Sequence, residues 1–73
     1  MSLADDLSAI ASKVEDIEAL NGEVIFNWIK LEDEYQYRVR VSGIPNSPPI
    51  STTANSADEM ITFLNLIITE MGG

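Results

Sequence analysis

Residues 23–42, EVIFNWIKLEDEYQYRVRVS, decide the fold of this chain because apolar and polar side chains alternate along much of the stretch. A period of two is typical of β-strands, and Val, Ile, Tyr, Phe and Trp favour that conformation. The acidic run Glu32-Asp33-Glu34 divides the stretch and predicts a β-hairpin. Because the run contains no Gly or Asn, we expect a loop of about three to five residues instead of a two-residue type I′ turn.

Two registers of this hairpin are compatible with the sequence. If Leu31 pairs with Tyr35, both tyrosines share a face with Ile25. A shift by one residue instead places Trp28 beside the tyrosines and leaves Ile25 with the two arginines, because side chains of a strand alternate between its faces. Either register leaves large apolar side chains on both faces of the sheet.

The segment before the hairpin has the spacing of an amphipathic helix. Its apolar side chains recur every three or four residues, at Leu3, Leu7, Ile10, Val14 and Ile17. Ser2 is a candidate N-cap and Asn21-Gly22 a stop signal, which together predict a helix over about residues 3–20. A seam of this length also suits a coiled coil, but we expect the helix to pack within its own domain.

A second helix is predicted over about residues 57–71. Ser56-Ala57-Asp58-Glu59 has the S-x-x-E pattern of a capping box, and Gly72 follows the segment. Apolar residues leave only a narrow polar stripe on this helix, so we expect it to be buried on more than one side.

The connection between hairpin and second helix holds all three prolines and reads as a loop. Its last part, Ile50-Ser51-Thr52-Thr53, contains three β-branched residues, and this content is compatible with a short edge strand, although a loop is the alternative. We therefore predict an α+β fold with the order helix–β-hairpin–helix (αββα, with an optional short third edge strand). Both helices pack on one face of a small antiparallel sheet, in a single domain over residues 1–73.

The composition excludes most catalytic chemistry. The chain has 73 residues and contains neither Cys nor His, so the usual zinc, haem and iron–sulfur ligands and the common nucleophile–histidine pairs are missing. Paired carboxylates catalyse reactions in concave, partly desolvated sites, which a domain of this size rarely builds. We expect a non-enzyme with no catalytic residues, no metal site and no cofactor.

The sequence also suggests a location. The absence of Cys favours a reducing compartment. The N-terminal segment carries Asp5 and Asp6 where an export signal would carry basic residues. Thr62, Asn65 and Thr69 interrupt the longest apolar stretch, which is too short for a membrane span. We therefore expect a cytoplasmic protein without membrane contact.

The charge is strongly acidic, with twelve Asp and Glu against four Lys and Arg and a formal net charge of −8. Direct nucleic-acid binding is disfavoured by this balance. We interpret two groups of carboxylates as candidate docking residues for a basic partner, although they also suit a merely solvated surface. These acidic candidates are Glu15, Asp16, Glu18 and Glu23 around the end of the first helix, and Glu32, Asp33 and Glu34 at the hairpin tip.

The predicted elements carry more apolar surface than two helices and two strands can hide. We therefore expect a two-fold homodimer that buries the free sheet face or the last helix, the alternative being a compact monomer. The apolar candidates for a dimer or partner contact are Phe26, Trp28, Phe63 and Leu66.

These features favour a small acidic non-catalytic protein–protein interaction module, which binds stoichiometrically through an apolar patch with an acidic rim. Two alternatives remain. One is an acidic inhibitor or nucleic-acid mimic that acts on a basic protein, and the other is a structural subunit of a larger assembly such as a phage particle.

Overall fold

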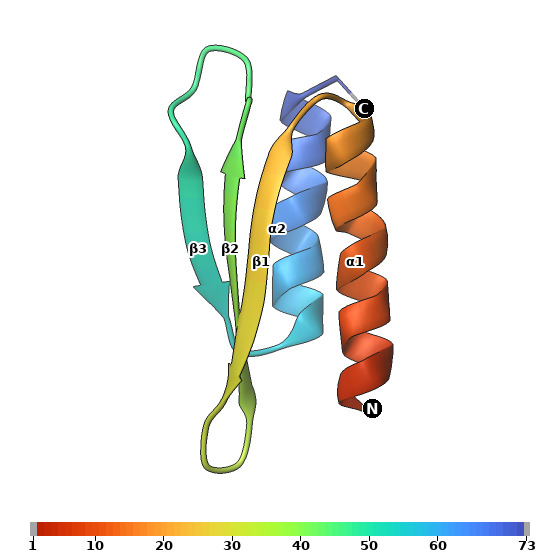
Figure 1. Cartoon of the computed structure of the whole chain (residues 1–73), viewed down its shortest axis with the longest axis vertical. Helices are drawn as coiled ribbons and strands as arrows, with labels where there is room; N and C mark the ends of the chain where they lie inside the picture. The colour runs from red at the N-terminus through yellow and green to blue at the C-terminus, as the bar shows by residue number, and fades with distance from the viewer. Residues whose placement is uncertain (1, 73) are drawn as a thin grey trace.

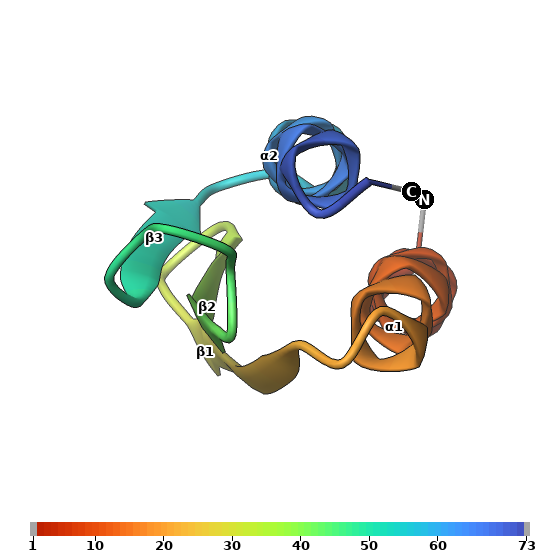
Figure 2. The same cartoon turned by 90° about the horizontal axis from the view of Figure 1, so that it is seen from above.

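Five elements make up the fold in a computed structural model that describes residues 2–72. They are α1 (Leu3–Ala19), β1 (Glu23–Lys30), β2 (Tyr35–Ser42), β3 (Ile50–Ala54) and α2 (Ala57–Glu70). The strands form an antiparallel sheet in the order β1-β2-β3, and both helices lie side by side on one of its faces (Figures 1 and 2). The predicted α+β fold is confirmed, and the optional edge strand is present as β3.

The hairpin adopts the second of the two registers. Lys30 pairs with Tyr35, so Trp28 lies opposite Tyr37. This register directs the apolar side chains of β2 toward the helices, where Tyr37, Val39 and Val41 are buried. Residues 31–34 connect the strands and none of them has a positive φ, which excludes the type I′ turn as expected.

Both predicted helix starts are confirmed by their caps. The Ser2 side chain accepts a hydrogen bond from the Asp5 amide at 3.2 Å, and the Ser56 side chain accepts one from the Glu59 amide, also at 3.2 Å. Each cap satisfies an amide that the first turn of a helix leaves without a partner. The helix bounds agree with the predicted ranges to within one residue.

The Asn21-Gly22 stop works differently from a glycine C-cap. Asn21 takes the left-handed conformation, with φ of 70°. Gly22 is needed for space, because a Cβ atom there would lie 2.6 Å from Cγ2 of Ile17 and 2.8 Å from Cε of Met71. The glycine thus allows the chain to pass close to the ends of both helices.

The core lies between the sheet and the helices. Its buried side chains are Ile10, Ile17, Tyr37, Val39, Val41, Ile44, Ala54, Ala57, Met60, Leu64 and Ile67. On α2 the flanking residues Ile61, Phe63 and Ile68 are half-buried, whereas Leu66 is exposed. The wide apolar surface of α2 is therefore covered along one row and its flanks, but not at Leu66.

Candidate functional site

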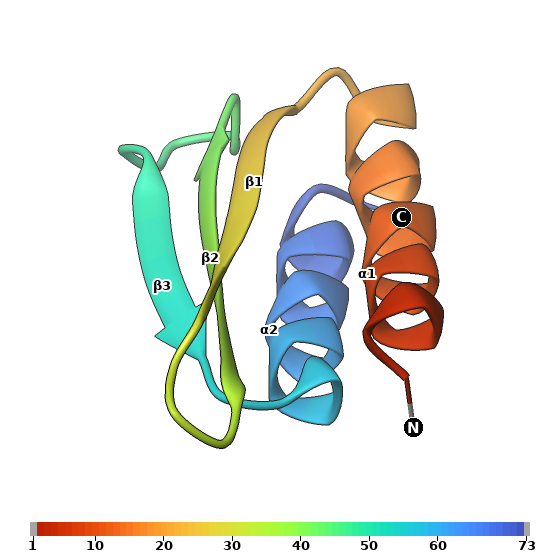
Figure 3. The ribbon, with the colours of Figure 1, turned by 60° about the horizontal axis from the view of Figure 1, so that its bottom comes forward.

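The β1–β2 hairpin extends past the helices at one end of the molecule (Figures 1 and 3). Both helices begin at this end, because three successive strands reverse the chain direction so that α1 and α2 run the same way. We call the surface formed here by Trp28, Leu31 and Tyr35 with the carboxylates of Asp6, Glu34 and Asp58 the hairpin end.

Aromatic side chains give the hairpin end its apolar part. The rings of Trp28 and Tyr35 lie 5.7 Å apart at 79°, an edge-to-face arrangement. The Lys30 ammonium lies 6.0 Å from the centre of the Tyr35 ring, within the range of a cation–π contact. Trp28 is on the helix-facing side of the sheet, yet 40% of it is exposed, and Leu31 is 38% exposed. The helices thus leave a large aromatic side chain open to solvent.

Carboxylates from three different parts of the chain surround a hollow of about 310 Å³ that Tyr35 also lines. The lining side chains are Asp6, Glu34, Tyr35, Tyr37, Asn55, Ser56, Ala57 and Asp58. Asn55 Nδ2 donates a hydrogen bond to Glu34 Oε1 at 3.5 Å. The hollow therefore has an acidic wall beside an aromatic one.

Tyr37 forms the buried floor of this region and donates a hydrogen bond from its hydroxyl to Asp6 Oδ2 at 3.3 Å. Burial raises the pKa of Tyr37, and the negative charge and hydrogen bond of Asp6 raise it further. The hydroxyl thus stays protonated at neutral pH and remains a donor, which ties the hairpin to the first turn of α1.

The structure separates the acidic candidates into two groups at opposite ends of a molecule 38 Å long. Glu15, Asp16, Glu18 and Glu23 lie near the junction of α1 and β1, and Glu32, Asp33 and Glu34 lie at the hairpin tip. Four further acidic residues join the second group, and they were not identified as site residues from the sequence. They lie in the first turns of the two helices and are Asp5, Asp6, Asp58 and Glu59. The signal that predicts this gathering is the third strand, because it sets the direction of α2.

The apolar candidates have different exposures. Trp28 is 40% and Leu66 is 63% exposed, whereas Phe26 and Phe63 are half-buried. The Phe26 ring stacks on Tyr37, with ring centres 6.3 Å apart. Phe26 therefore belongs to the packing of the sheet against the helices, and Trp28 and Leu66 are the candidates that offer substantial surface.

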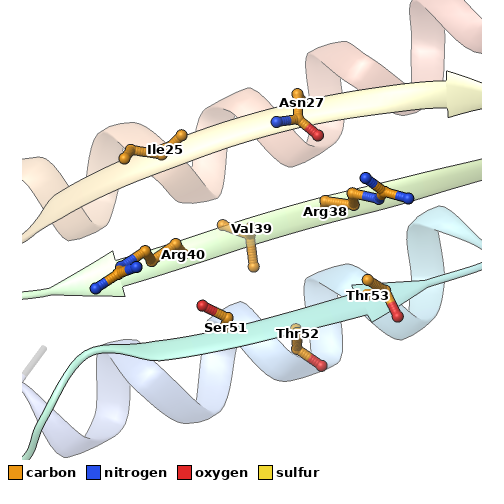
Figure 4. Close-up of a pocket in the computed structure, with 8 residues that line it drawn as sticks. All are labelled: Ile25, Asn27, Arg38, Val39, Arg40, Ser51, Thr52 and Thr53. Carbon is orange, nitrogen blue, oxygen red and sulfur yellow. The ribbon is translucent and has the colours of Figure 1, made fainter.

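A second surface is the free face of the sheet, which the sequence suggested as one of two dimer surfaces without naming its residues. The face of the sheet opposite the helices, here called the outer face, is covered by neither helix (Figure 4). It forms an open groove of about 500 Å³ lined by Ile25, Asn27, Arg38, Val39, Arg40, Ser51, Thr52 and Thr53. Two of the four basic residues of the chain lie here, and Ile25 is 65% exposed. Their juxtaposition follows from the register, which the sequence left open.

Metal and membrane sites find no support in the described part of the chain. Within residues 2–72, no three His, Cys, Asp or Glu side chains are grouped so that they could hold a metal ion. None of the helices in the same range has both the length and the apolar composition needed to cross a bilayer. Comparisons with protein families, curated proteins and solved structures return no match to this chain.

Proposed function

We propose that this protein is a small non-catalytic binding module that attaches to another protein through the hairpin end. The observation that carries the proposal is the exposure of Trp28, 40% of which is open to solvent. Trp28 lies two residues before the end of β1, next to the hairpin that protrudes past the helices (Figure 1). Tryptophan is enriched among the residues that dominate binding energy at protein interfaces. Burying the only tryptophan of the chain would lower the free energy of the folded state. Its exposure is therefore better explained if a partner covers it in the complex.

The surroundings of Trp28 indicate the chemistry of that partner. Asp6, Glu34 and Asp58 line a hollow together with Tyr35, the ring that Trp28 contacts edge-to-face, and the Lys30 ammonium lies over the Tyr35 ring. A partner with basic side chains next to an apolar one would meet both carboxylates and aromatic faces. The proposed partner is therefore a protein segment that combines Lys or Arg with apolar side chains.

Titration with a short peptide of alternating lysine and leucine tests this proposal. Trp28 is the only tryptophan, so its fluorescence reports directly on the hairpin end. We expect a saturable change in emission with the basic peptide and none with a matched peptide in which glutamate replaces lysine. Glu34→Gln and Asp58→Asn should each weaken binding by about two- to fivefold, the range of an exposed ion pair.

Calorimetry with Trp28→Ala completes the test, because this variant lacks the fluorescent reporter. Binding should fall by about tenfold or more if Trp28 is an anchor. Leu66→Ala removes an exposed apolar side chain from α2 and serves as the matched control. Equal loss of binding in both variants, or unchanged binding in Trp28→Ala, would contradict the proposal.

The gathering of carboxylates at the hairpin end supports a second candidate, an inhibitor that presents carboxylates where a nucleic acid presents phosphates. Calorimetric titration with the same basic peptide distinguishes the two. A mimic needs the carboxylates but not the aromatic anchor, so its binding would survive Trp28→Ala and disappear after Glu32, Asp33 and Glu34 are replaced by lysine.

A further inference from the structure

The outer face of the sheet has a charge pattern that reverses along its length. The ladder between β1 and β2 aligns Ile25 with Arg40, Asn27 with Arg38 and Ile29 with Gln36. The hydrogen bond from the Leu31 amide to the Glu34 carbonyl, at 2.7 Å, continues this ladder by one pair. Four cross-strand rows thus share the outer face, and they run from Leu31 with Glu34 at the hairpin tip to Ile25 with Arg40 at the other end.

We propose that a second copy of this chain packs on the outer face, with its strands antiparallel to those of the first and related by a two-fold axis. In this arrangement the row of Leu31 and Glu34 in one copy lies on the row of Ile25 and Arg40 in the other. Along β2 the side chains on this face are Gln36, Arg38 and Arg40. Glu34 precedes β2, and continuing the alternation of the strand by one residue assigns it to the same face. Reversing that order places each Glu34 against an Arg40, and each Gln36 against an Arg38.

The same stagger matches the apolar side chains. Ile25 is 65% and Leu31 is 38% exposed, and both belong to the few large apolar residues that the described chain leaves exposed. Because Ile25 lies in the row of Arg40 and Leu31 in the row of Glu34, the shift that pairs the charges also brings Ile25 onto Leu31. One arrangement therefore satisfies two independent features of the surface.

Other arrangements on this face are unfavourable. An antiparallel stack centred between Arg38 and Arg40 would bring arginines against arginines, and like charges at an interface select against such packing. Arg38 donates hydrogen bonds from Nε and from one terminal nitrogen to Gln36 Oε1, at 3.3 and 3.2 Å. This cluster remains intact in the proposed dimer, since Gln36 and Arg38 of the two copies meet near the axis.

The size and the ends of the interface limit its strength. Strands of this length span roughly 25 Å and lie about 4.8 Å apart, so each copy offers a few hundred square ångströms, at the small end of specific interfaces. At each end of the dimer Glu23 of one copy approaches Asp33 of the other, which adds repulsion between carboxylates. We therefore expect a weak dimer that strengthens when Asp33 is neutralised by Asp33→Asn.

The proposed dimer shares Leu31 and Glu34 with the hairpin end but does not use its aromatic pair. Trp28 and Tyr35 belong to the face of the sheet that points toward the helices, so pairing through the outer face leaves both rings free. A dimer of this kind would present two Trp28–Tyr35 pairs to partners, with Leu31 and Glu34 of each copy already engaged.

Sedimentation equilibrium of the full chain up to millimolar concentration, at about 0.15 M salt, tests the proposed dimer; at this ionic strength charges beyond about 8 Å are largely screened. We expect a monomer–dimer equilibrium. Glu34→Arg and Arg40→Glu should each weaken it by about tenfold or more, because each places two like charges in contact at both ends of the two-fold interface.

The combined variant Glu34→Arg with Arg40→Glu separates loss of the charge pair from general damage to the fold. It restores opposite charges across the axis and should recover most of the dimer. Glu15→Arg, an exposed change on α1, serves as the matched control and should leave the equilibrium unchanged. A wild-type chain that stays monomeric, grows beyond a dimer, or dimerises with equal strength in both single variants would overturn the proposal.

Discussion

The two faces of the sheet are built by the same three strands and have opposite chemistry. On β2 the side chains of Tyr37, Val39 and Val41 point toward the helices and are at most 4% exposed. Their neighbours Arg38 and Arg40 point to the outer face, and neither α1 nor α2 covers that face. Folding therefore constrains every second residue of these strands and leaves the others available for contacts with other molecules.

Truncating adjacent residues of β2 should show the largest contrast between the faces. Tyr37→Ala should lower the free energy of unfolding by about 3–5 kcal/mol, because it removes a large buried ring and leaves a cavity. Arg38→Ala, one residue along, should change it by less than about 0.5 kcal/mol. Urea unfolding followed by circular dichroism measures both, and similar losses in the two variants would remove the distinction between the faces.

Introducing threonine at two neighbouring positions of β2 compares the two faces of the sheet with the same new side chain. Val39→Thr places a hydroxyl in the core and should cost about 1–3 kcal/mol, since the hydroxyl has lost its water and gained no defined partner. Arg40→Thr adds the same hydroxyl on the outer face, where water remains available, and should be nearly neutral. Thermal unfolding of both variants gives the comparison, and an unchanged stability of Val39→Thr would show that the side chains of the inner face are not tightly packed.

The smallest effect concerns the link between the inner face and α1. Tyr37→Phe keeps the ring and removes the hydroxyl that bonds Asp6, so we expect a loss of about 0.5–1.5 kcal/mol at neutral pH. The folded state raises the pKa of Tyr37, so this tyrosine stabilises the fold fully below its ordinary pKa. That stabilisation is lost as pH rises through the higher pKa of the folded state.

Unfolding experiments at neutral and strongly alkaline pH check the prediction for Tyr37. The wild-type chain should lose more stability between the two conditions than Tyr37→Phe does. An identical alkaline loss in both chains would mean that Tyr37 titrates in the folded protein as it does in the unfolded one.

Local features of the fold could be predicted from sequence because each depends on a few neighbouring residues. Ser2 and Ser56 cap their helices through amides three residues away, and the alternation from Tyr35 to Val41 is visible in the sequence itself. The register of the hairpin could not be predicted, since either choice hides a similar set of apolar side chains. It is decided by packing against both helices, which is a property of the whole fold.

The candidate site depended on the weakest of the local signals. The sequence offers residues 50–53 only as a possible short edge strand. As β3 (Ile50–Ala54), this segment reverses the chain once more and brings the start of α2 to the hairpin tip. Asp58 thereby joins Asp6 and Glu34 around one hollow. With two strands instead of three, α2 would run the other way and the acidic residues of its first turn would lie at the opposite end.

Methyl NMR of the isoleucine and leucine side chains, recorded over a series of protein concentrations, tests most directly whether the outer face is a contact surface. We predict concentration-dependent shifts for the methyl groups of Ile25, Ile29 and Leu31, and constant shifts for the buried methyl groups of Ile10 and for those of Leu66 on α2. Shifts centred on Leu66, with the outer-face methyl groups unchanged, would contradict it and would place the contact between copies on α2.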